Sequence, residues 1–132
     1  MQVVVIGCGK IGIKFAKKMS GLNNDVTIID SNKELTKKIS KEFDGRVING
    51  LEFDKTILEN ANVKEANCIV VSTDKDNTNI MVAQVLNKIF DVKNIIICLQ
   101  NPSLAKIYED SSFKIICPTN IVTDKIMEIM DK

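Results

Sequence analysis

The chain has 132 residues, 45% of them hydrophobic and 27% charged, which is typical of one globular domain that buries its own core. A net charge of +1 gives no reason to expect nucleic acid or an anionic membrane surface as a partner. No apolar run approaches the roughly 20 residues that cross a bilayer, and Met1 leads directly into an apolar run rather than a signal peptide. We therefore expect a soluble, cytoplasmic protein.

Residues that commonly bind metals or transfer protons are scarce. The chain has no histidine, which is the usual zinc ligand and the usual acid or base at neutral pH. Its four cysteines, which form no Cys-x-x-Cys pair, are Cys8, Cys68, Cys98 and Cys117. Three of them lie in or beside apolar runs, and we expect those three to be small buried hydrophobic residues rather than parts of disulfides or a metal site. The sequence therefore predicts no metal site, no catalytic residue and no enzymatic activity.

Six short apolar runs rich in β-branched residues alternate with segments of helical pattern. The runs lie at residues 2–6, 26–29, 46–48, 68–71, 95–99 and 114–117. They are nearly continuous rather than alternating, which is typical of parallel strands covered on both faces. Strands that alternate with helices imply right-handed crossovers. The prediction is an α/β fold with a doubly wound, parallel, six-stranded Rossmann-like sheet, in a single domain over residues 1–132.

The first helical pattern places apolar residues on one face and lysines on the other. The apolar residues are Ile11, Phe15, Met19 and Leu22, and the lysines are Lys10, Lys14, Lys17 and Lys18. A second pattern follows Ser31–Asn32, which is a predicted helix cap, and a third pattern is shorter. Their apolar residues are Leu35, Ile39 and Phe43 in the second, and Phe53, Ile57, Leu58 and Ala61 in the third.

Two later segments are more apolar than an ordinary surface helix. Residues 77–90 carry apolar side chains all round, so we expect that helix to be buried on more than one side. After Pro118, a wide apolar stripe covers residues 121–130. Such a terminal helix packs either on its own sheet or on a second subunit, and the width of the stripe favours the second subunit.

A glycine turn, Gly7-Cys8-Gly9-Lys10-Ile11-Gly12, joins the first apolar run to the first helix. Strand, turn and helix in this order form the dinucleotide-binding fingerprint, although the glycine pattern alone is weak evidence. Gly7 permits the tight turn, Gly9 lets a pyrophosphate approach the backbone, and Gly12 allows close contact between helix and strand. The N–H groups and the positive dipole end of the helix would hold phosphate, and Lys10 would add a charge.

Asp30 completes this fingerprint at the end of the second apolar run. A carboxylate there accepts hydrogen bonds from both ribose hydroxyls and repels a 2′-phosphate. Since no basic residue directly follows Asp30, NAD or an adenine nucleotide is favoured over NADP. The alternative is that Asp30 only caps a helix or serves in a surface turn.

Two polar loops follow the third and fourth apolar runs, where strand ends should line the same crevice. Asn49-Gly50-Leu51-Glu52 would flank the adenine, and Ser72-Thr73-Asp74 would flank the central phosphates or the far ribose. Ordinary turn chemistry explains these residues about equally well.

The whole chain resembles the nucleotide-binding lobe of the Trk/Ktr potassium-uptake regulators, known as the TrkA-N or RCK N-terminal domain. The resemblance rests on the glycine turn, on Ile28-Ile29-Asp30-Ser31-Asn32 and on Val47-Ile48-Asn49-Gly50. Its most particular part is the stretch 69–79, which reads IVVSTDKDNTN, because many dehydrogenases share the glycine motif. Asn101-Pro102 also falls where the family has a similar pair.

The resemblance implies a regulatory subunit that binds NAD(H), ATP or ADP, with AMP as a further candidate, and places Ser31 in the ribose-binding segment. Such lobes form homodimers and rings on the cytoplasmic face of a membrane potassium channel or transporter. The ligand changes the shape of the ring and thereby transport. Relatives commonly carry a second, C-terminal domain; since this chain ends at Lys132, we expect a separate RCK-type subunit to supply that part.

Two positions depart from the family pattern. Leu51 stands where the family often has an acidic residue. Cys98 stands where it often has an arginine that reaches a nucleotide phosphate. Loss of that arginine is expected to weaken binding or to alter the choice of ligand.

Two other functions stay open at the level of sequence. A small NAD-dependent oxidoreductase would need a proton-transfer residue, and Tyr108 is the only tyrosine in a chain without histidine. A nucleotide or redox sensor for a partner outside transport is compatible with the same residues.

Overall fold

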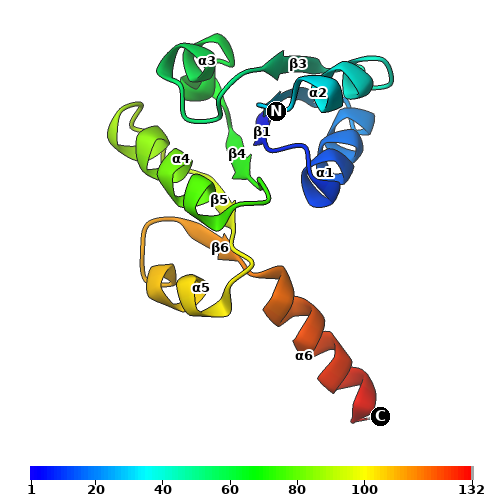
Figure 1. Ribbon diagram of the computed structural model, residues 1–132, viewed down its shortest axis with the longest axis vertical. Helices are drawn as coiled ribbons and strands as arrows, with labels where there is room; N and C mark the ends of the chain where they lie inside the picture. Colours follow the sequence, from blue (N-terminus) through cyan, green and yellow to red (C-terminus); the bar gives the residue numbers. More distant parts are fainter. Residues whose placement is uncertain (132) are drawn as a thin grey trace.

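Six parallel strands form the centre of the computed structural model, which describes residues 1–131 (Figure 1). They are β1 (Gln2–Ile6), β2 (Asp25–Asp30), β3 (Arg46–Asn49), β4 (Cys68–Val71), β5 (Ile95–Cys98) and β6 (Lys114–Ile116). Their order across the sheet is β3-β2-β1-β4-β5-β6. The predicted doubly wound, six-stranded parallel sheet is confirmed.

The strand order reverses at β1, which has β2 on one side and β4 on the other. Ile6 pairs with Ile29 of β2 and with Val71 of β4, so the carboxyl ends of these three strands lie level. At such a reversal in an open parallel sheet, the loops after two neighbouring strands run to opposite faces of the sheet. The space between these loops is a crevice. The fold therefore places the loops after β1, β2 and β4 around one crevice.

Helices connect the strands, as the alternating pattern predicts. They are α1 (Lys10–Gly21), α2 (Lys33–Ser40), α3 (Lys55–Asn60), the 3₁₀ turn η1 (Val63–Glu65), α4 (Asp76–Lys88), α5 (Pro102–Tyr108) and α6 (Pro118–Met130). The side chains of Asn32, Asp54 and Asn101 accept hydrogen bonds from N–H groups in the first turns of α2, α3 and α5. These caps fix where the three helices begin.

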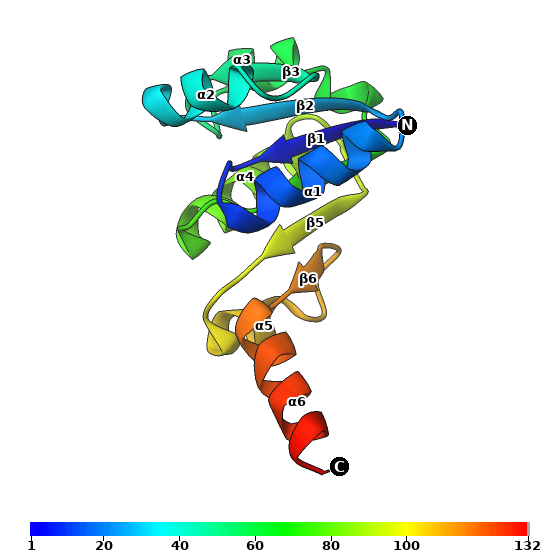
Figure 2. The same cartoon turned by 90° about the vertical axis from the view of Figure 1, so that its right-hand side faces the viewer.

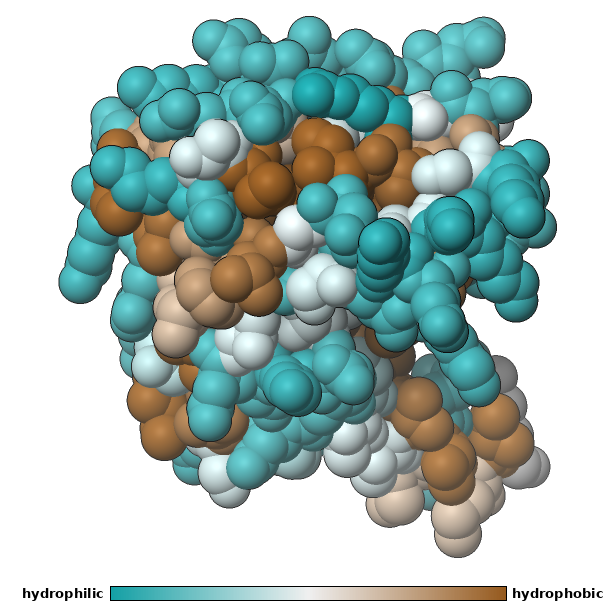
Figure 3. Space-filling view, turned by 45° about the horizontal axis from the view of Figure 1, so that its top comes forward, coloured by the Kyte–Doolittle hydropathy of each residue, from teal (hydrophilic) through white to brown (hydrophobic). Residues whose placement is uncertain are grey.

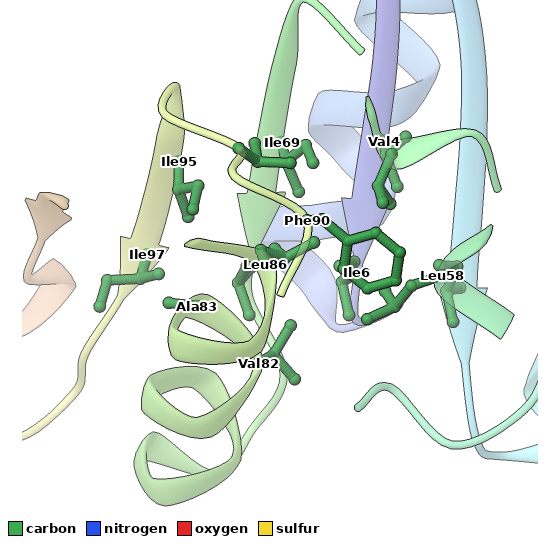
Figure 4. Close-up of a cluster of buried hydrophobic side chains, with 14 of the residues drawn as sticks. Val4, Ile6, Leu58, Ile69, Val82, Ala83, Leu86, Phe90, Ile95 and Ile97 are labelled. Carbon is green, nitrogen blue, oxygen red and sulfur yellow. The ribbon is translucent and has the colours of Figure 1, made fainter. Parts of the chain in front are cut away.

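Two layers of helices cover the two faces of the sheet (Figure 2). α1 and α2 pack on the face that Val3, Val5 and Ile28 present. α3, α4 and α5 pack on the opposite face, where the larger apolar cluster lies. Figure 4 shows Val82, Ala83, Leu86 and Phe90 packed against strand residues such as Val4, Ile6, Ile69, Ile95 and Ile97.

The predicted buried face of α1 is partly wrong. Ile11 and Leu22 are 46% and 72% exposed, whereas Gly12 and Ala16 are buried. The helix lies so close to β1 that small residues, rather than the large ones one position away, occupy the contact. Phe15 and Met19 pack only at the margin of the apolar cluster.

Two further expectations about burial are wrong. α4 covers the sheet with one side only, because Met81 on its outer side and Ile89 directly after the helix are exposed. β6 is not covered on both faces, since Ile116 is exposed at the edge of the sheet. The cluster beneath α1 and α2 contains no residue of β5 or β6.

α6 does not pack on its own sheet. It extends away from the domain (Figures 1 and 2), and within the described chain it has no buried residue. Its apolar side chains are open to solvent (Figure 3), among them Ile121, Val122, Ile126, Met127 and Ile129. Among residues 1–131, no helix has both the length and the apolar character needed to span a bilayer.

The division of α4 into an inner and an outer side predicts unequal effects of two truncations. Leu86→Ala should lower the free energy of unfolding by about 2–5 kcal/mol, because Leu86 is fully buried against the sheet. Met81→Ala on the exposed side should change it by less than about 1 kcal/mol. Urea unfolding of both variants measures the difference, and equal losses would contradict the packing described.

Candidate nucleotide-binding site

Gly7 and Gly12 are required by close packing at the turn between β1 and α1. Gly7 has a φ of +109°, and a Cβ there would lie 2.5 Å from the Thr73 nitrogen. A Cβ on Gly12 would lie 2.2 Å from the Gly7 carbonyl oxygen. No larger side chain fits at either position without moving backbone.

Gly9 is different, because the fold does not require a glycine there. Its backbone is extended, with φ −67° and ψ 179°, and a Cβ would come no closer than 3.7 Å to the Ser72 carbonyl oxygen. Gly9 also stands at the N-terminus of α1, where no side chain of the described residues caps the first turn. The missing side chain leaves room directly over unpaired helix N–H groups, which is where an anion binds best.

Asp30 joins the glycine turn to the start of α2. Its Oδ2 accepts a hydrogen bond from the Cys8 N–H at 2.7 Å, and its Oδ1 accepts one from the Asn32 N–H at 2.8 Å. Asp30 therefore does have the role in a turn that was the alternative to ribose binding. Acceptor positions remain for a ligand, because a carboxylate offers about four of them and these hydrogen bonds occupy two.

Glu52 places a second carboxylate beside Asp30. It is only 7% exposed, and its Oε2 accepts a hydrogen bond from the Ser31 N–H at 2.7 Å. Gly50, two residues earlier, donates its N–H to the Asp30 carbonyl oxygen. The loop after β3 is thus tied directly to the loop after β2.

The loops after β1, β2, β3 and β4 enclose a cleft of about 470 Å³. Its lining residues are Gly9, Asp30, Ser31, Asn32, Leu35, Leu51, Glu52, Phe53, Thr73, Asp74, Lys75 and Thr78. Leu35, Leu51 and Phe53 give the cleft an apolar wall on the β3 side. The formal charges of the lining are three carboxylates and one lysine, Lys75.

Seven of the predicted site residues line this cleft: Gly9, Asp30, Ser31, Leu51, Glu52, Thr73 and Asp74. The other eight predicted residues do not line it. Four are buried, two begin α1 with exposed side chains, and the last two are the residue directly after β3 and the last residue of β5. In that order they are Gly7, Cys8, Gly12 and Ser72; Lys10 and Ile11; and Gly50 and Cys98. Whether any of the fifteen touches a nucleotide stays a prediction.

Sequence reasoning missed five lining residues, namely Asn32, Leu35, Phe53, Lys75 and Thr78. Lys75 and Thr78 lie inside the stretch 69–79, and Phe53 directly follows the loop of Gly50. Their position after strand ends is the only signal that could have marked them, because nothing in their residue types points to a ligand.

Asn79 explains part of the distinctive stretch 69–79 in structural terms. It is 1% exposed, and its Nδ2 donates to the carbonyl oxygens of Thr73 at 3.1 Å and Cys98 at 2.8 Å. Its Oδ1 accepts from the Thr73 N–H at 3.0 Å and from the Thr73 hydroxyl. One buried amide therefore holds the cleft loop after β4 against the end of β5.

Burial raises the pKa of the Cys8 thiol from 9.0 to about 12, and the nearby carboxylates of Asp30 and Glu52 add to the rise. Burial also raises the pKa of Cys98. A neutral, buried thiol at Cys98 cannot supply the positive charge of the arginine that related sequences were expected to carry there. Among the described residues, Lys75 is the one cation that lines the cleft.

Asn79→Ala should lower the free energy of unfolding by about 2–4 kcal/mol, because it removes the partner of the buried Cys98 carbonyl oxygen and of the Thr73 N–H. Asn77→Ala, an exposed neighbour in the same stretch, should change it by less than about 0.5 kcal/mol. Chemical unfolding compares the two variants; similar small losses for both would show that the amide does not hold the loops.

Because the folded state raises the Cys8 pKa, it retains a proton that the unfolded chain releases at lower pH. The contribution of the protonated Cys8 thiol to the stability of the folded state is therefore complete below pH 9.0. It is lost as the pH rises toward about 12. Cys8→Ala should therefore lose less stability than the unmodified chain over this range. Unfolding curves at several alkaline pH values test this, and identical pH profiles would count against a buried neutral thiol.

Solved structures with this fold include the NAD(P)-binding domain of an exopolyphosphatase-related protein from Archaeoglobus fulgidus. That structure has a TM-score of 0.83, 15% sequence identity, and covers 98% of this chain and 96% of its own. The GsuK channel bound to NAD has a TM-score of 0.77 and 15% identity, and the match covers 89% of this chain and 21% of that one. At these identities the likeness concerns the fold alone.

In sequence, the chain is similar to the Trk system potassium uptake protein TrkA homolog of Pyrococcus horikoshii. The two are 36% identical over 110 residues, which cover 83% of this chain and 48% of the relative. The chain spans 57% and 48% of the length of two of the relatives it matches, and 30% of a third. The TrkA-N domain model matches residues 3–118, and the chain therefore belongs to the TrkA-N domain family.

Proposed function

We propose that the chain is a nucleotide-sensing regulatory domain of a potassium uptake system. The observation that carries this proposal is that the uncapped N-terminus of α1, at Gly9, and the Asp30 carboxylate line the same cleft of about 470 Å³. Family membership supports the assignment to potassium transport, because the relatives carry the name of the Trk potassium uptake system.

The proposed ligand is NAD(H), ATP or ADP, with AMP as a further candidate. Its phosphates bind over Gly9, where helix N–H groups and the helix dipole attract an anion. The ribose hydroxyls donate to the Asp30 carboxylate, and the base lies against Leu35, Leu51 and Phe53. Proteins of the same fold support this range, since GsuK has been solved with NAD and with ADP, and a Shewanella denitrificans Kef domain with AMP.

NADP is disfavoured by the two neighbouring carboxylates. A 2′-phosphate on the ribose would stand beside Asp30 and the buried Glu52, both of which repel it. The one arginine of the chain, Arg46, donates to the Asn60 carbonyl oxygen instead.

We place the protein in the cytoplasm, at the inner face of the membrane, through a potassium channel or transporter subunit. The exposed apolar side of α6 fits pairing with a second copy in a homodimer or ring. A separate RCK-type subunit completes the assembly where one exists. Nucleotide binding controls transport only if it favours one arrangement of the ring over another.

Gly9→Ala separates ligand binding from folding. The added methyl group occupies the space over the α1 N-terminus, so the Kd for ADP and for NAD should rise at least about tenfold. The free energy of unfolding should stay within about 0.5 kcal/mol, because the Cβ meets no close neighbour. Isothermal titration and urea unfolding measure the two quantities.

Gly21→Ala is the matched control, since it adds the same methyl group at the far end of α1 in open space. It should leave nucleotide affinity unchanged. Equal affinity of all three proteins for ADP and NAD, or no affinity in any of them, would refute the proposed site.

The transport role has a separate test. The chain should co-purify with the membrane subunit of a Trk-type potassium transporter, and ADP or NAD should alter potassium flux in the reconstituted complex. Nucleotide binding without any such partner would instead favour a sensor for an assembly outside transport.

A further inference from the structure

Asp76 is the part of the stretch 69–79 that the proposed site leaves unexplained. It is the first residue of α4 and directly follows Thr73, Asp74 and Lys75, which line the cleft. Its carboxylate turns to another loop: Oδ1 accepts from the Gln100 N–H at 2.8 Å, and Oδ2 accepts from the Asn101 N–H at 2.9 Å. One side chain therefore joins the cleft loop after β4 to the loop after β5.

The same loop holds the first turn of α6. The Gln100 carbonyl oxygen accepts a hydrogen bond from the Thr119 hydroxyl at 2.8 Å, and Thr119 is the second residue of α6. The Gln100 carbonyl and the Asn101 N–H belong to one planar peptide group. Asp76 accepts a hydrogen bond from one end of this planar group and Thr119 donates one to the other end, so a single peptide group joins the two contacts.

The direction of α6 depends on its first turn, because no residue of the helix is buried within the described chain. The 13 residues of α6 form a rod of about 20 Å. A small rotation of the Gln100–Asn101 peptide therefore becomes a larger displacement at the free end of the helix.

We propose that Asp76 is a positioning residue that links nucleotide occupancy of the cleft to the direction of α6. The inference rests on the proposed function, since it needs a nucleotide in the cleft. Phosphates that draw Lys75 and Thr73 toward them also move the first residue of α4. Asp76 then passes that movement through the Gln100–Asn101 peptide to Thr119 and α6.

A local role for Asp76 makes a different prediction. An acidic residue in the first turn of α4 stabilises that helix through its dipole, and its loss would then affect α4 alone. The linking role requires that loss of Asp76 changes the conformation at Thr119 and along α6. Asp76 is far from α6 in the sequence, and its carboxylate accepts its hydrogen bonds from Gln100 and Asn101.

Backbone amide NMR of the full chain, titrated with ADP, distinguishes the two. In the unmodified chain, ADP should shift the amide signals of residues 119–121 as well as those of the cleft. In Asp76→Asn these shifts at 119–121 should fall by at least about threefold, while the Kd for ADP changes by less than about threefold. Asp110→Asn, an exposed acid in the loop before β6, is the matched control and should behave like the unmodified chain.

Thr119 supplies the second arm of the experiment. Thr119→Val removes the hydroxyl and should reduce the shifts at 120–121 as Asp76→Asn does, whereas Thr119→Ser keeps the hydroxyl and should restore them. Without ADP, Asp76→Asn should still move the signals of 119–121 more than Asp110→Asn does.

The outcomes separate the inference from the proposed function. Unchanged signals at 119–121 in Asp76→Asn, with or without ADP, would overturn the link even if ADP binds. Failure of ADP to bind the unmodified chain would refute both the proposed function and nucleotide control of α6. Equal behaviour of Thr119→Val and Thr119→Ser would likewise exclude the Thr119 hydroxyl as the link.

Discussion

The contact between α1 and the turn at Gly7 determines where everything else in the site can lie. A Cβ on Gly12 would come within 2.2 Å of the Gly7 carbonyl oxygen, so the helix sits on the strand with no side chain between them. This contact aims the N-terminus of α1 at the point where the strand order reverses. Gly9 then leaves those N–H groups without a covering side chain, and Asp30, at the end of β2, accepts a hydrogen bond from the neighbouring Cys8 N–H.

Hydrogen bonds of polar side chains, rather than further hydrophobic packing, connect the loops around the crevice. Asp30 and Glu52 tie together the loops after β1, β2 and β3. Asn79 and Asp76 tie the loop after β4 to the loop after β5. Glu52 and Asn79 are buried, and a buried carboxylate or amide is costly to leave without hydrogen-bond partners, so these contacts favour the observed arrangement of the loops. A ligand that engages one loop therefore acts on a connected set.

The sheet could be predicted from sequence because nearly continuous β-branched runs are typical of buried parallel strands. The buried face of α1 could not, because the closeness of the helix depends on Gly12 and Ala16, whose small size gives no hydrophobic signal. In the site, Asp30 and Gly9 stand at fixed places in a motif, whereas Leu35, Phe53 and Lys75 reach the cleft only through tertiary structure. The outward direction of α6 agrees with its wide apolar stripe, which its own sheet does not cover.

The most direct test of this account is a crystal structure of the chain with bound ADP. The diphosphate should lie over Gly9, within hydrogen-bond distance of N–H groups in the first turn of α1, and the ribose hydroxyls should donate to the Asp30 carboxylate. A nucleotide bound elsewhere, or a cleft that holds only water at saturating ADP, would contradict it.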